Sequence, residues 1–382
     1  MSRSRPRAVV ADDSHFMRSV ISDILEGGGI EVVGEARNGH EAVDLVAEVD
    51  PDVVTMDVEM PEMDGIEAVE RIMAEHPTPI VMLSAHTDEN ADVTFEALDA
   101  GAVDFFTKPG GEVSMEMSRL EDQLVEMVSS VAEADVTGGD VAAGTGAGSD
   151  ATASPAGTTA GRDAGTDAGV EAGGGTSAAT SATARRYVED PTLVIGSSTG
   201  GPKMVEQVMC ELPRGAEFRV LVVQHMPDGF TGRFAERVDA NSDYDVREAR
   251  DGDRLGGGEA LIAPGNSHLE VSNYHAGRLR VSVTDDPPVN SVRPSVDVTM
   301  RSAAGTVTDP IVGVILTGMG EDGAAGIKAI KAVDGHTIAQ NEETSAVFGM
   351  PKRAIETGHV DDVLPIGEIP GRILDTAAAE GI

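Results

Sequence analysis

The sequence predicts an α/β protein with two parallel-sheet domains joined by a long disordered linker. Three observations predict this organisation. Short apolar runs alternate with amphipathic stretches in both the first and the last part of the chain, and this alternation is typical of βα units whose strands pair in parallel. Of the 53 residues from 134 to 186, 40 are Ala, Gly, Thr or Ser. The chain has 382 residues, a length that accommodates two domains.

Residues 1–133 form the first predicted domain, a (βα)5 fold. Five short apolar runs each precede a stretch whose apolar residues recur with helical spacing. The predicted strands cover residues 7–11, 31–36, 52–56, 79–83 and 103–105. The predicted helices cover residues 14–26, 39–48, 64–75, 88–99 and 112–130. This order predicts a parallel sheet with helices on both faces.

Residues 134–186 form the predicted linker, and residues 187–382 form the second predicted domain. The linker has 12 glycines and, as larger apolar residues, only three valines, so it cannot bury enough apolar surface to offset the entropy lost on ordering. In the second domain the predicted strands cover residues 192–197, 218–224, 259–263, 311–317 and 336–340, alternating with helical segments such as 201–211 and 323–332. This order predicts a larger α/β domain with a doubly wound sheet.

The composition restricts the partners and the location of the protein. Acidic residues number 66 and basic residues 28, giving a formal charge of −38. Such a surface repels phosphate backbones, which excludes non-specific nucleic-acid binding, and the excess of acids predicts adaptation to a salt-rich cytoplasm. The single cysteine, Cys210, excludes an internal disulfide and suits a reducing compartment. No apolar run approaches the roughly 18 residues that span a bilayer, so we expect a cytoplasmic protein without membrane insertion.

Three carboxylates are expected to converge at the carboxyl edge of the first sheet. Asp12 and Asp13 end the first predicted strand, and Asp57 ends the third. In an open parallel sheet, ligands bind at this edge, beside a switch in strand order. Three acids placed together repel one another unless a hard cation lies among them, and Mg²⁺ takes oxygen ligands of this kind. The sequence therefore predicts a Mg²⁺ site at Asp12, Asp13 and Asp57.

Two further polar residues end later strands of the same domain. Ser84 follows the fourth apolar run, and Lys108 follows the fifth. A cation, a hydroxyl and an ammonium around one exposed carboxylate suit the formation of an acyl phosphate: Asp57 attacks the phosphoryl donor while Mg²⁺ and Lys108 neutralise the developing charge. Any single acid in so acidic a chain is more often a helix cap or a solvated loop residue, but that role does not explain all of these residues in this order.

These residues resemble the receiver domain of two-component response regulators. The resemblance covers nearly all of residues 1–130 and includes the segment MPEMDG shortly after Asp57. It implies phosphorylation of Asp57 and a conformational switch through Ser84, Phe105 and Lys108. Phe105 stands where receivers often have tyrosine, so the usual hydroxyl of the switching aromatic is missing here.

The second domain opens with a serine in a strand–turn–helix motif. The predicted strand 192–197 runs into Gly-Ser-Ser-Thr-Gly at positions 196–200, and a helical segment follows. A G-x-S-x-G turn of this kind exposes a serine hydroxyl at a helix N-terminus, whose N–H groups can stabilise an oxyanion. Ser198 holds the central position and is the candidate nucleophile. Ser197 is the alternative, although a turn or cap hydroxyl is its more ordinary role.

A serine nucleophile needs a base and an acid that orients the base. Among nine histidines, His225 directly follows the strand 218–224, the next apolar run after the serine turn. His268 is the main alternative. For the acid, both Glu321 and Asp322 follow the strand 311–317, and spacing alone does not choose between them.

Two other classes of function compete with this hydrolase interpretation. Residues 318–323 read G-x-G-x-x-G between a predicted strand and a helix, which is the dinucleotide-binding fingerprint. Glu321 and Asp322 would then lie beside a pyrophosphate at the helix N-terminus, which is electrostatically unfavourable, and Ser198 and His225 would be unexplained. Alternatively, the second domain is a non-catalytic docking module and the protein a phosphate sink. A serine, a histidine and an aspartate at three strand ends argue against that interpretation.

Together, several segments of the second domain resemble the CheB family, the chemotaxis protein-glutamate methylesterases. They are residues 196–202, 224–227, 229–231, 263–265, 293–297 and 316–325. The resemblance spans about residues 190–370, and the order receiver, linker, esterase strengthens it. It implies a catalytic triad of Ser198, His225 and Asp322, with oxyanion-stabilising backbone positions at Thr199 and Met319.

The resemblance also implies a reaction and partners. The expected reaction is hydrolysis of γ-glutamyl methyl esters on methyl-accepting chemoreceptors, with deamidation of certain receptor glutamines as a second activity. A chemotaxis histidine kinase is the expected phosphodonor for Asp57. We expect Mg²⁺ in the receiver domain, no cofactor in the esterase domain, and a monomer. The linker is longer than we expect for the family.

Overall fold

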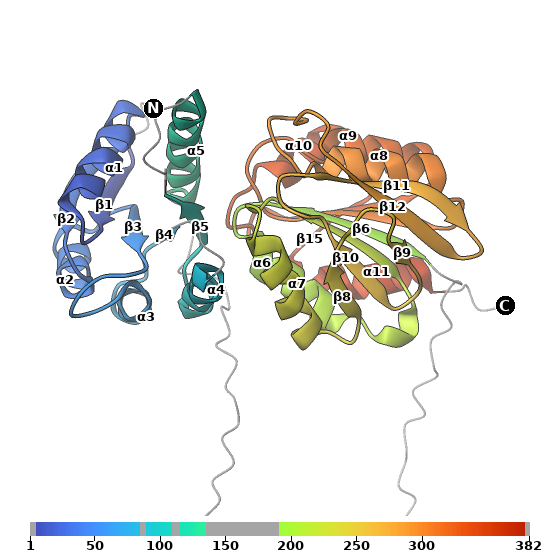
Figure 1. Ribbon diagram of the computed structural model, residues 1–382, viewed down its shortest axis with the longest axis horizontal. Helices are drawn as coiled ribbons and strands as arrows, with labels where there is room; N and C mark the ends of the chain where they lie inside the picture. Colours follow the sequence, from blue (N-terminus) through green and yellow to red (C-terminus); the bar gives the residue numbers. More distant parts are fainter. Residues whose placement is uncertain (1–4, 85–88, 109–114, 135–190, 379–382) are drawn as a thin grey trace, which may run out of the picture. The chain divides into compact units, whose positions relative to one another are not determined.

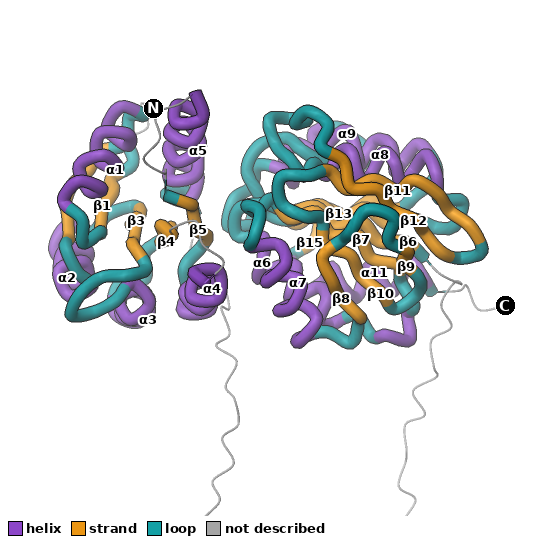
Figure 2. Tube along the Cα trace, viewed as in Figure 1, coloured by secondary structure: helices purple, strands orange, loops and turns teal. Residues whose placement is uncertain are grey.

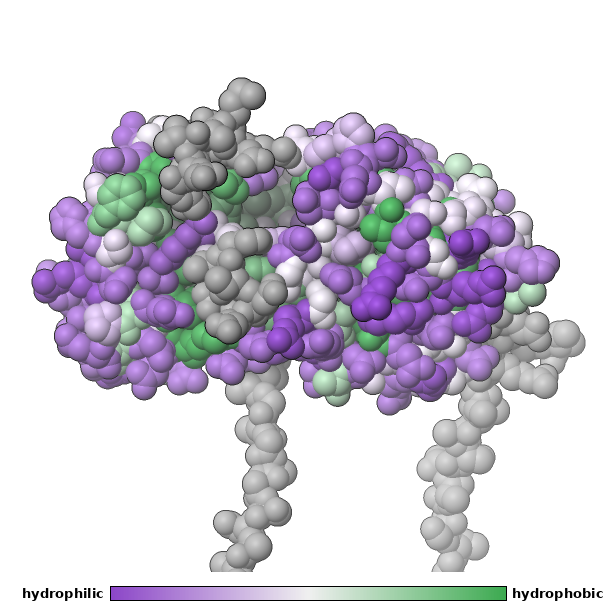
Figure 3. Space-filling model, in the orientation of Figure 1, coloured by the Kyte–Doolittle hydropathy of each residue, from purple (hydrophilic) through white to green (hydrophobic). Residues whose placement is uncertain are grey.

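The computed structural model describes residues 5–84, 89–108, 115–134 and 191–378 (Figure 1). Of the predicted linker, only Ala134 lies inside these ranges. The described residues contain a five-stranded, a seven-stranded and a three-stranded sheet. Mostly hydrophilic residues cover the face seen in Figure 3, in agreement with the acidic composition. Within the described ranges, no helix has both the length and the apolar character needed to cross a membrane.

The N-terminal domain contains a parallel sheet with the strand order β2-β1-β3-β4-β5. Its strands are β1 (Arg7–Ala11), β2 (Glu31–Ala36), β3 (Val53–Asp57), β4 (Ile80–Ser84) and β5 (Asp104–Thr107). Its helices are α1 (His15–Gly27), α2 (Gly39–Val49), α3 (Gly65–Glu75), α4 (Glu89–Ala100) and α5 (Met115–Val131). Every predicted element is present, with its ends shifted by two residues or less. Two predicted helix starts, residue 88 and residues 112–114, lie outside the described residues.

Side chains alternate between two apolar layers along each strand of this sheet. On one face, Val9 and Val54 belong to the cluster that includes buried residues of α2, α3 and α4. On the other face, Val10 and Val81 pack with α1 and α5, for example with Leu124. Helices therefore cover both faces, as predicted, and leave the carboxyl ends of the strands as the place where polar groups gather.

Polar caps determine where the first helices of this domain begin. The side chains of Ser14, Asn38 and Asp64 accept hydrogen bonds from backbone N–H groups in the first turns of α1, α2 and α3, which otherwise have no partner within the helix. Asp12 Oδ1 in turn accepts the N–H of Ser14 at 2.9 Å. The start of α1 thereby helps to fix one carboxylate at the edge of the sheet.

The C-terminal domain contains a parallel sheet with the strand order β15-β14-β13-β6-β7-β10-β8. Its strands are β6 (Thr192–Ser197), β7 (Arg219–Gln224), β8 (Asp245–Glu248), β10 (Glu259–Ile262), β13 (Ile311–Ile315), β14 (His336–Gln340) and β15 (Asp362–Leu364). Its helices are α6 (Gly201–Glu211), α7 (Phe230–Asn241), α8 (Val296–Thr306), α9 (Ala324–Ala332), α10 (Met350–Glu356) and α11 (Ile369–Ala377). The chain builds the sheet outward from β6 in both directions, so the doubly wound fold class is confirmed.

Helices cover both faces of this sheet as well. Residues of α6, α7 and α11, such as Val208 and Phe234, pack on one face. Residues of α8, α9 and α10, such as Met300 and Ile327, pack on the other. Successive strands are added to the sheet on one side of β6 and then on the other. This switch in strand order places the crevice expected for ligands at the carboxyl ends of the central strands.

A small antiparallel sheet was not predicted from the sequence. It contains β9 (Arg254–Leu255), β11 (His268–His275) and β12 (Arg278–Thr284) in the order β11-β12-β9, separate from the large sheet (Figure 2). The buried Arg219 at the start of β7 donates to the carbonyl of Gly277 in the β11–β12 turn and pairs with Asp309. The prediction also missed β8 and β15, because these short strands form the edges of the large sheet and carry little apolar signal.

Candidate active site and phosphoacceptor site

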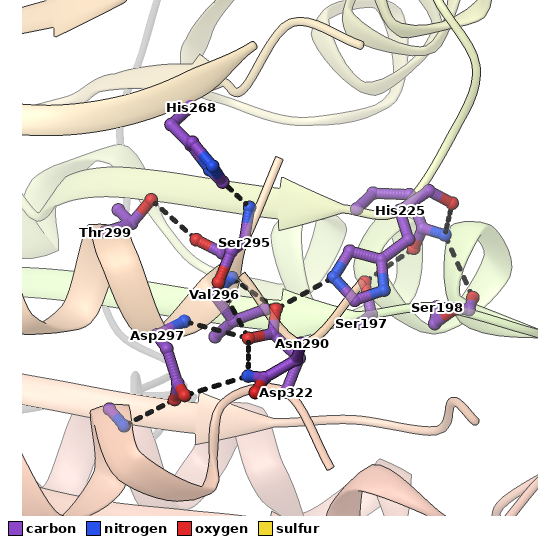
Figure 4. A network of polar contacts seen from close by, with 12 residues as sticks. Ser197, Ser198, His225, His268, Asn290, Ser295, Val296, Asp297, Thr299 and Asp322 are labelled. Carbon is purple, nitrogen blue, oxygen red and sulfur yellow. Dashed lines mark hydrogen bonds and ion pairs between the residues drawn. The ribbon is translucent and has the colours of Figure 1, made fainter. Parts of the chain in front are cut away.

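Three adjacent strands at the centre of the catalytic sheet bring the candidate triad together. In the order β13-β6-β7, Asp322 lies in the segment between β13 and α9, Ser198 directly follows β6, and His225 directly follows β7. Parallel strands end at the same edge, so residues 27 and 97 positions from His225 meet there (Figure 4). The topology thus agrees with the expectation from the sequence that the polar residues of this site follow the ends of strands.

The turn around Ser198 depends on glycines at two close approaches. Gly200 has φ of +72°, a left-handed conformation that residues with a Cβ adopt only with strain. A Cβ at Gly318, in the neighbouring strand-end loop, would lie 2.7 Å from Ser198 Cβ. Ser198 N–H donates to the carbonyl of Thr317 at 3.0 Å, and its carbonyl accepts from Gln224 Nε2 at 2.9 Å. The backbone of the candidate nucleophile is therefore held from both neighbouring strands.

Ser197 has a different environment from Ser198. Its side chain is fully buried, and its hydroxyl donates to Gln224 Oε1 at 2.5 Å. Ser198 is only partly buried. The arrangement gives Ser197 a structural role within the sheet and leaves the hydroxyl of Ser198 as the one of the pair that a substrate can approach.

His225 and Asp322 form a direct hydrogen bond. The distance between His225 Nε2 and Asp322 Oδ2 is 3.0 Å, and the side chain of Asp322 is 3% exposed. Because a carboxylate accepts, Nε2 carries the proton in this pairing and Nδ1 remains as the basic nitrogen. In the described part of the chain, no hydrogen bond joins Ser198 Oγ to the imidazole. Catalytic hydrogen bonds are often long or absent in free enzymes, so this geometry is compatible with the predicted pairing of Ser198 and His225.

Asp322 accepts hydrogen bonds from several groups besides His225. Ser295 Oγ and Asn290 Nδ2 donate to its Oδ1, each at 2.8 Å, and the backbone N–H of Val296 donates to its Oδ2 at 2.6 Å. Val296 begins α8, so the carboxylate also lies at a helix N-terminus. Burial acts to raise the pKa of Asp322, but the hydrogen bonds from His225, Ser295 and Asn290 hold the pKa below its ordinary value. The group is thus a fixed negative charge.

The two alternatives to His225 and Asp322 lie elsewhere. His268 is 1% exposed; its Nδ1 accepts the N–H of Ser295, and its Nε2 contacts the carbonyl of Pro287. Glu321 is exposed. The structure therefore makes His268 a buried packing residue near the site and directs Glu321 to solvent.

Thr199 and Met319 flank the serine at the positions expected to bind an oxyanion. The carbonyl of Thr199 accepts from Thr317 Oγ1 at 2.9 Å, and Gly318 N–H donates to the carbonyl of Val347 at 3.0 Å, so both loops are anchored. Among the described residues, neither the N–H of Thr199 nor that of Met319 has a hydrogen-bond acceptor. These donors remain available for an oxyanion.

The second polar site lies at the carboxyl edge of the receiver sheet. One ligand oxygen from each of Asp12, Asp13 and Asp57 lies within 4.8 Å of the others. Lys108 Nζ contacts Asp12 Oδ2 at 2.8 Å and Asp57 Oδ1 at 2.7 Å. A single ammonium therefore faces three carboxylates, and the oxygen donors and the remaining negative charge fit Mg²⁺. Burial raises the pKa of Asp57 despite the opposing effect of Lys108.

The predicted switch residues lie beside this cluster. Ser84 is fully buried at the end of β4 and accepts a hydrogen bond from Thr94 Oγ1 at 3.1 Å. Phe105 in β5 is 6% exposed, and its ring stacks on Phe230 at the start of α7 with 4.7 Å between centroids. Phe105, the predicted switching aromatic, therefore contacts the helix that follows the His225 loop.

Comparison with known proteins identifies both domains. A sequence model of the CheB methylesterase family matches residues 193–373, and a model of the response regulator receiver domain matches residues 8–118. A Haloarcula marismortui protein named protein-glutamate methylesterase/protein-glutamine glutaminase is 68% identical over 384 residues, covering 98% of each chain. The chain belongs to the CheB methylesterase family. This confirms both resemblances and the enzyme class that they imply.

Other relatives extend the comparison. A Halobacterium salinarum protein with the same name is 54% identical, with 97% of this chain and 98% of that one covered. The crystal structure of the Thermotoga maritima CheB methylesterase catalytic domain is similar to this chain with 41% identity and a TM-score of 0.47, covering 49% of this chain and 99% of that one. The halobacterial relatives agree with the salt adaptation that the acidic composition predicts.

Three residues that contact the CheB site were given no role from the sequence, although one of them, Ser295, lies in the segment 293–297 that carries the family resemblance. Ser295 and Asn290 donate to Asp322, and Asp104 Oδ2 in β5 accepts the N–H of Gly200 at 3.3 Å. Ser295 precedes α8, so a helix-start signal could have indicated it. Asn290 and Asp104 carry no comparable signal, because their contacts cross 32 and 96 positions of the sequence.

The geometry of residues 318–323 contradicts the dinucleotide-binding interpretation. Asp322 is buried and bonded to His225, and a Cβ at Gly318 would meet Ser198. The glycines therefore allow the loop to approach the serine turn, and the carboxylate occupies the space in which a pyrophosphate would need N–H donors.

Proposed function

We propose that the chain hydrolyses γ-glutamyl methyl esters of methyl-accepting chemoreceptors, and deamidates certain receptor glutamines, with Ser198 as nucleophile, His225 as base and Asp322 as the orienting acid. The observation that carries the proposal is the pairing of His225 Nε2 with the buried Asp322 beside the serine turn. The names of the relatives support the two activities. The triad supplies the nucleophile and the proton transfers, so we expect the esterase reaction to need no cofactor.

In the proposed reaction, Ser198 Oγ attacks the ester carbonyl carbon while its proton passes to His225 Nδ1. The N–H groups of Thr199 and Met319 stabilise the negative oxygen that forms. The tetrahedral intermediate collapses when the imidazolium gives its proton to the methoxy oxygen, and methanol leaves. Water, giving a proton to His225, then attacks the acyl-serine, so that Ser198 regains its proton and a glutamate side chain is released. With a glutamine substrate, ammonia leaves in place of methanol.

The fixed charge of Asp322 favours this sequence of proton transfers. It holds the imidazole in the tautomer with a free Nδ1 and stabilises the imidazolium that forms after attack. Because the pKa of Asp322 is lowered, the carboxylate remains charged throughout and does not take the proton itself. His225 also borders a cavity of about 350 Å³, together with Met226 and Arg293 of the esterase domain and Leu120 and Gln123 of the receiver helix α5.

Methanol release from methylated receptor tests the catalytic assignment. We expect the full chain to release methanol and Ser198→Ala to lower the rate by at least about 10³-fold, because triad members act as a unit. Ser197→Ala is the matched control: it removes a hydroxyl one position away and should retain most of the activity of a folded sample. A near-normal rate in Ser198→Ala would assign the nucleophile elsewhere.

We further propose that Asp57 accepts a phosphoryl group from a chemotaxis histidine kinase. Asp12, Asp13 and Asp57 would hold Mg²⁺, which neutralises charge on the transferring phosphoryl group. Lys108 lies within contact distance of Asp57 and would bind the new phosphoryl oxygens. Ser84, at the end of β4, and Phe105, within the neighbouring strand β5, would carry the change away from the cluster.

We propose that the unphosphorylated receiver restrains the esterase through β5. Asp104 accepts the N–H of Gly200 beside Ser198, Phe105 stacks on Phe230, and Asp99 forms two hydrogen bonds with Arg237 of α7. Phosphorylation, by changing how Ser84 and Phe105 lie, would weaken these contacts and admit the receptor helix. We retain the domain boundaries 1–133, 134–186 and 187–382 as part of this proposal, with the enzyme acting as a cytoplasmic monomer.

A further inference from the structure

The amide of Asn290 links the triad acid to a second buried carboxylate. Asn290 Nδ2 donates to Asp322 Oδ1 at 2.8 Å and to Asp297 Oδ2 at 3.0 Å (Figure 4). Both acids are nearly inaccessible, with 2% exposure for Asp322 and 3% for Asp297. The same nitrogen therefore uses its two hydrogens on two buried negative groups.

Asp297 is itself firmly held. It lies in the first turn of α8, and its Oδ1 accepts the N–H of Gly326 in α9 at 2.6 Å. Arg301, one turn further along α8, places Nη2 3.8 Å from Asp297 Oδ2. Asp297 thus joins α8 to α9, the two helices that flank the Asp322 loop, and gives Asn290 a rigid point of attachment.

Electrostatics makes the bridging amide more than a packing contact. Because one nitrogen contacts both acids, the two bonded oxygens lie no more than about 6 Å apart, a distance at which buried like charges repel strongly. The N–H groups of the amide point their positive ends at both oxygens. Without them, Asp322 Oδ1 would retain only Ser295 Oγ at 2.8 Å and the more distant N–H of Asp297 at 3.4 Å. Because Asn290 is exposed, water rather than an oriented amide would then lie between the two carboxylates.

The backbone at Asn290 allows a clean test. Asn290 has φ of +51° and Ser291 has φ of +65°. Asparagine and aspartate tolerate this left-handed conformation better than most residues, and glycine adopts it freely. Replacement of Asn290 by glycine or aspartate therefore changes the side chain without imposing backbone strain.

We propose that Asn290 is a positioning residue for ester hydrolysis, which holds Asp322 in register with His225 by bridging it to Asp297. The proposal rests on the triad function proposed above. Asn290 does not border the cavity beside His225, so it acts on catalysis through Asp322. Its amide also offsets the repulsion between the carboxylates of Asp322 and Asp297. The carboxylate of Asp322 therefore does not rotate away from Asp297, and its negative charge stays directed at the imidazolium of His225.

The charged and titratable groups around this bridge come from three places. His225 approaches Asp322 from the end of β7. Asp297 and Arg301 belong to α8, and His268 of β11 faces the backbone of Ser295, which donates to Asp322. The group in direct contact with the triad acid that changes charge during the proposed reaction is His225, so a change in the bridge should register on the pH dependence of the rate.

The test compares Asn290→Gly and Asn290→Asp in the full chain by methanol release over a range of pH. We expect kcat to fall about 10- to 100-fold in Asn290→Gly, the usual effect of losing a hydrogen bond to a charged group, with KM changed little. Asn290→Asp should fall further, because a third carboxylate replaces the donor. In both variants the acid limb of the pH–rate profile should move to higher pH, because Asp322 becomes less compensated and favours the protonated imidazole. Asn273→Asp, which adds the same charge at an exposed position of β11, should change neither value.

A double variant separates this proposal from the triad assignment. In an Asp322→Asn background, Asn290→Gly should cost little more, because its effect passes through Asp322. Full additivity, an unshifted pH profile in Asn290→Asp, or a raised KM with unchanged kcat would overturn the positioning role and leave Asn290 as a loop residue. If Asp322→Asn alone retains normal activity, the triad assignment fails instead, and the two failures are thereby distinguishable.

Discussion

Asp57 and Asp322 occupy equivalent places in two different sheets, yet their surroundings differ in kind. Asp57 is the last residue of β3, and Asp322 lies in the loop after β13. Both side chains are buried at the carboxyl edge of a parallel sheet. Asp57 has one cationic neighbour, Lys108, and shares it with Asp12. Asp322 accepts from an imidazole, a hydroxyl, an amide and the start of a helix.

The pKa values of the two acids move in opposite directions as a result. Burial raises the pKa of Asp57, and Asp12 adds to the rise, so that Lys108 does not restore the ordinary value. Burial acts on Asp322 in the same direction, but its donors lower the pKa overall. An acid whose oxygens are all engaged can orient a neighbour but cannot attack. An acid with few donors keeps an oxygen available for a phosphoryl group or a cation.

The largest expected effect comes from removing the charge of Asp322. Asp322→Asn should lower kcat by about 10³- to 10⁴-fold, because the imidazole loses its orienting charge and can adopt the wrong tautomer, while KM changes little. Methanol-release kinetics provide the measurement. Glu321→Gln removes a charge from the neighbouring exposed position and should leave the rate nearly unchanged. Comparable losses of kcat in both variants would contradict the assignment of the orienting role to the buried, hydrogen-bonded Asp322 rather than to the exposed Glu321.

The other side of the comparison is tested by Asp57→Ala. This variant should lose all stimulation of the esterase by a phosphodonor with Mg²⁺, because the proposed phosphoacceptor carboxylate beside Lys108 is gone, while unstimulated activity persists. Asp52→Asn, at an exposed position directly before the same strand, should respond normally. Incorporation of acid-labile phosphate, measured in parallel, should vanish in the first variant only. Stimulation that persists in Asp57→Ala would place the phosphoryl group on another residue.

Strand ends explain how much of these sites could be predicted from the sequence. The receiver elements, and the central strands that position Ser198 and His225, follow from local apolar patterns, because buried parallel strands read as short apolar runs. The choice between Glu321 and Asp322 depends on which side chain turns inward, and local pattern does not contain that information. Asn290 lies in an irregular segment between β12 and α8, so only the folded chain brings it to Asp322. The antiparallel β11–β12 pair was missed because the prediction followed the alternation of strands and helices.

Asp104 provides a third comparison, because this buried acid accepts fewer hydrogen bonds than Asp322 and, among the described residues, has no cationic neighbour like the Lys108 of Asp57. Its oxygens accept the N–H groups of Phe105 at 2.8 Å and of Gly200 at 3.3 Å. Burial raises its pKa to about 7, although these two N–H groups and the hydroxyl of Thr199 oppose the rise. Burial of Asp104 thus favours the protonated acid, whereas the N–H of Gly200 and the hydroxyl of Thr199 in the serine turn favour the charged form but do not outweigh burial. By linkage, a group whose pKa is higher in the docked state takes up a proton on docking, so docking weakens as pH rises towards 7 and changes no further above it.

Asp104→Asn keeps the shape of the side chain and removes its titration. The measurement is the ratio of two unstimulated activities, that of the natural chain divided by that of Asp104→Asn. We expect this ratio to rise between about pH 5 and pH 7, by less than about tenfold per pH unit, and to stay constant at higher pH. Taking the ratio cancels the titration of His225, which both chains share. Asp99→Asn, which removes a contact with Arg237 instead, should raise unstimulated activity across the same range. A flat ratio for Asp104→Asn would mean that β5 does not restrain the serine turn through this acid, whereas a ratio that falls with pH would mean that ionised Asp104 strengthens docking through Gly200.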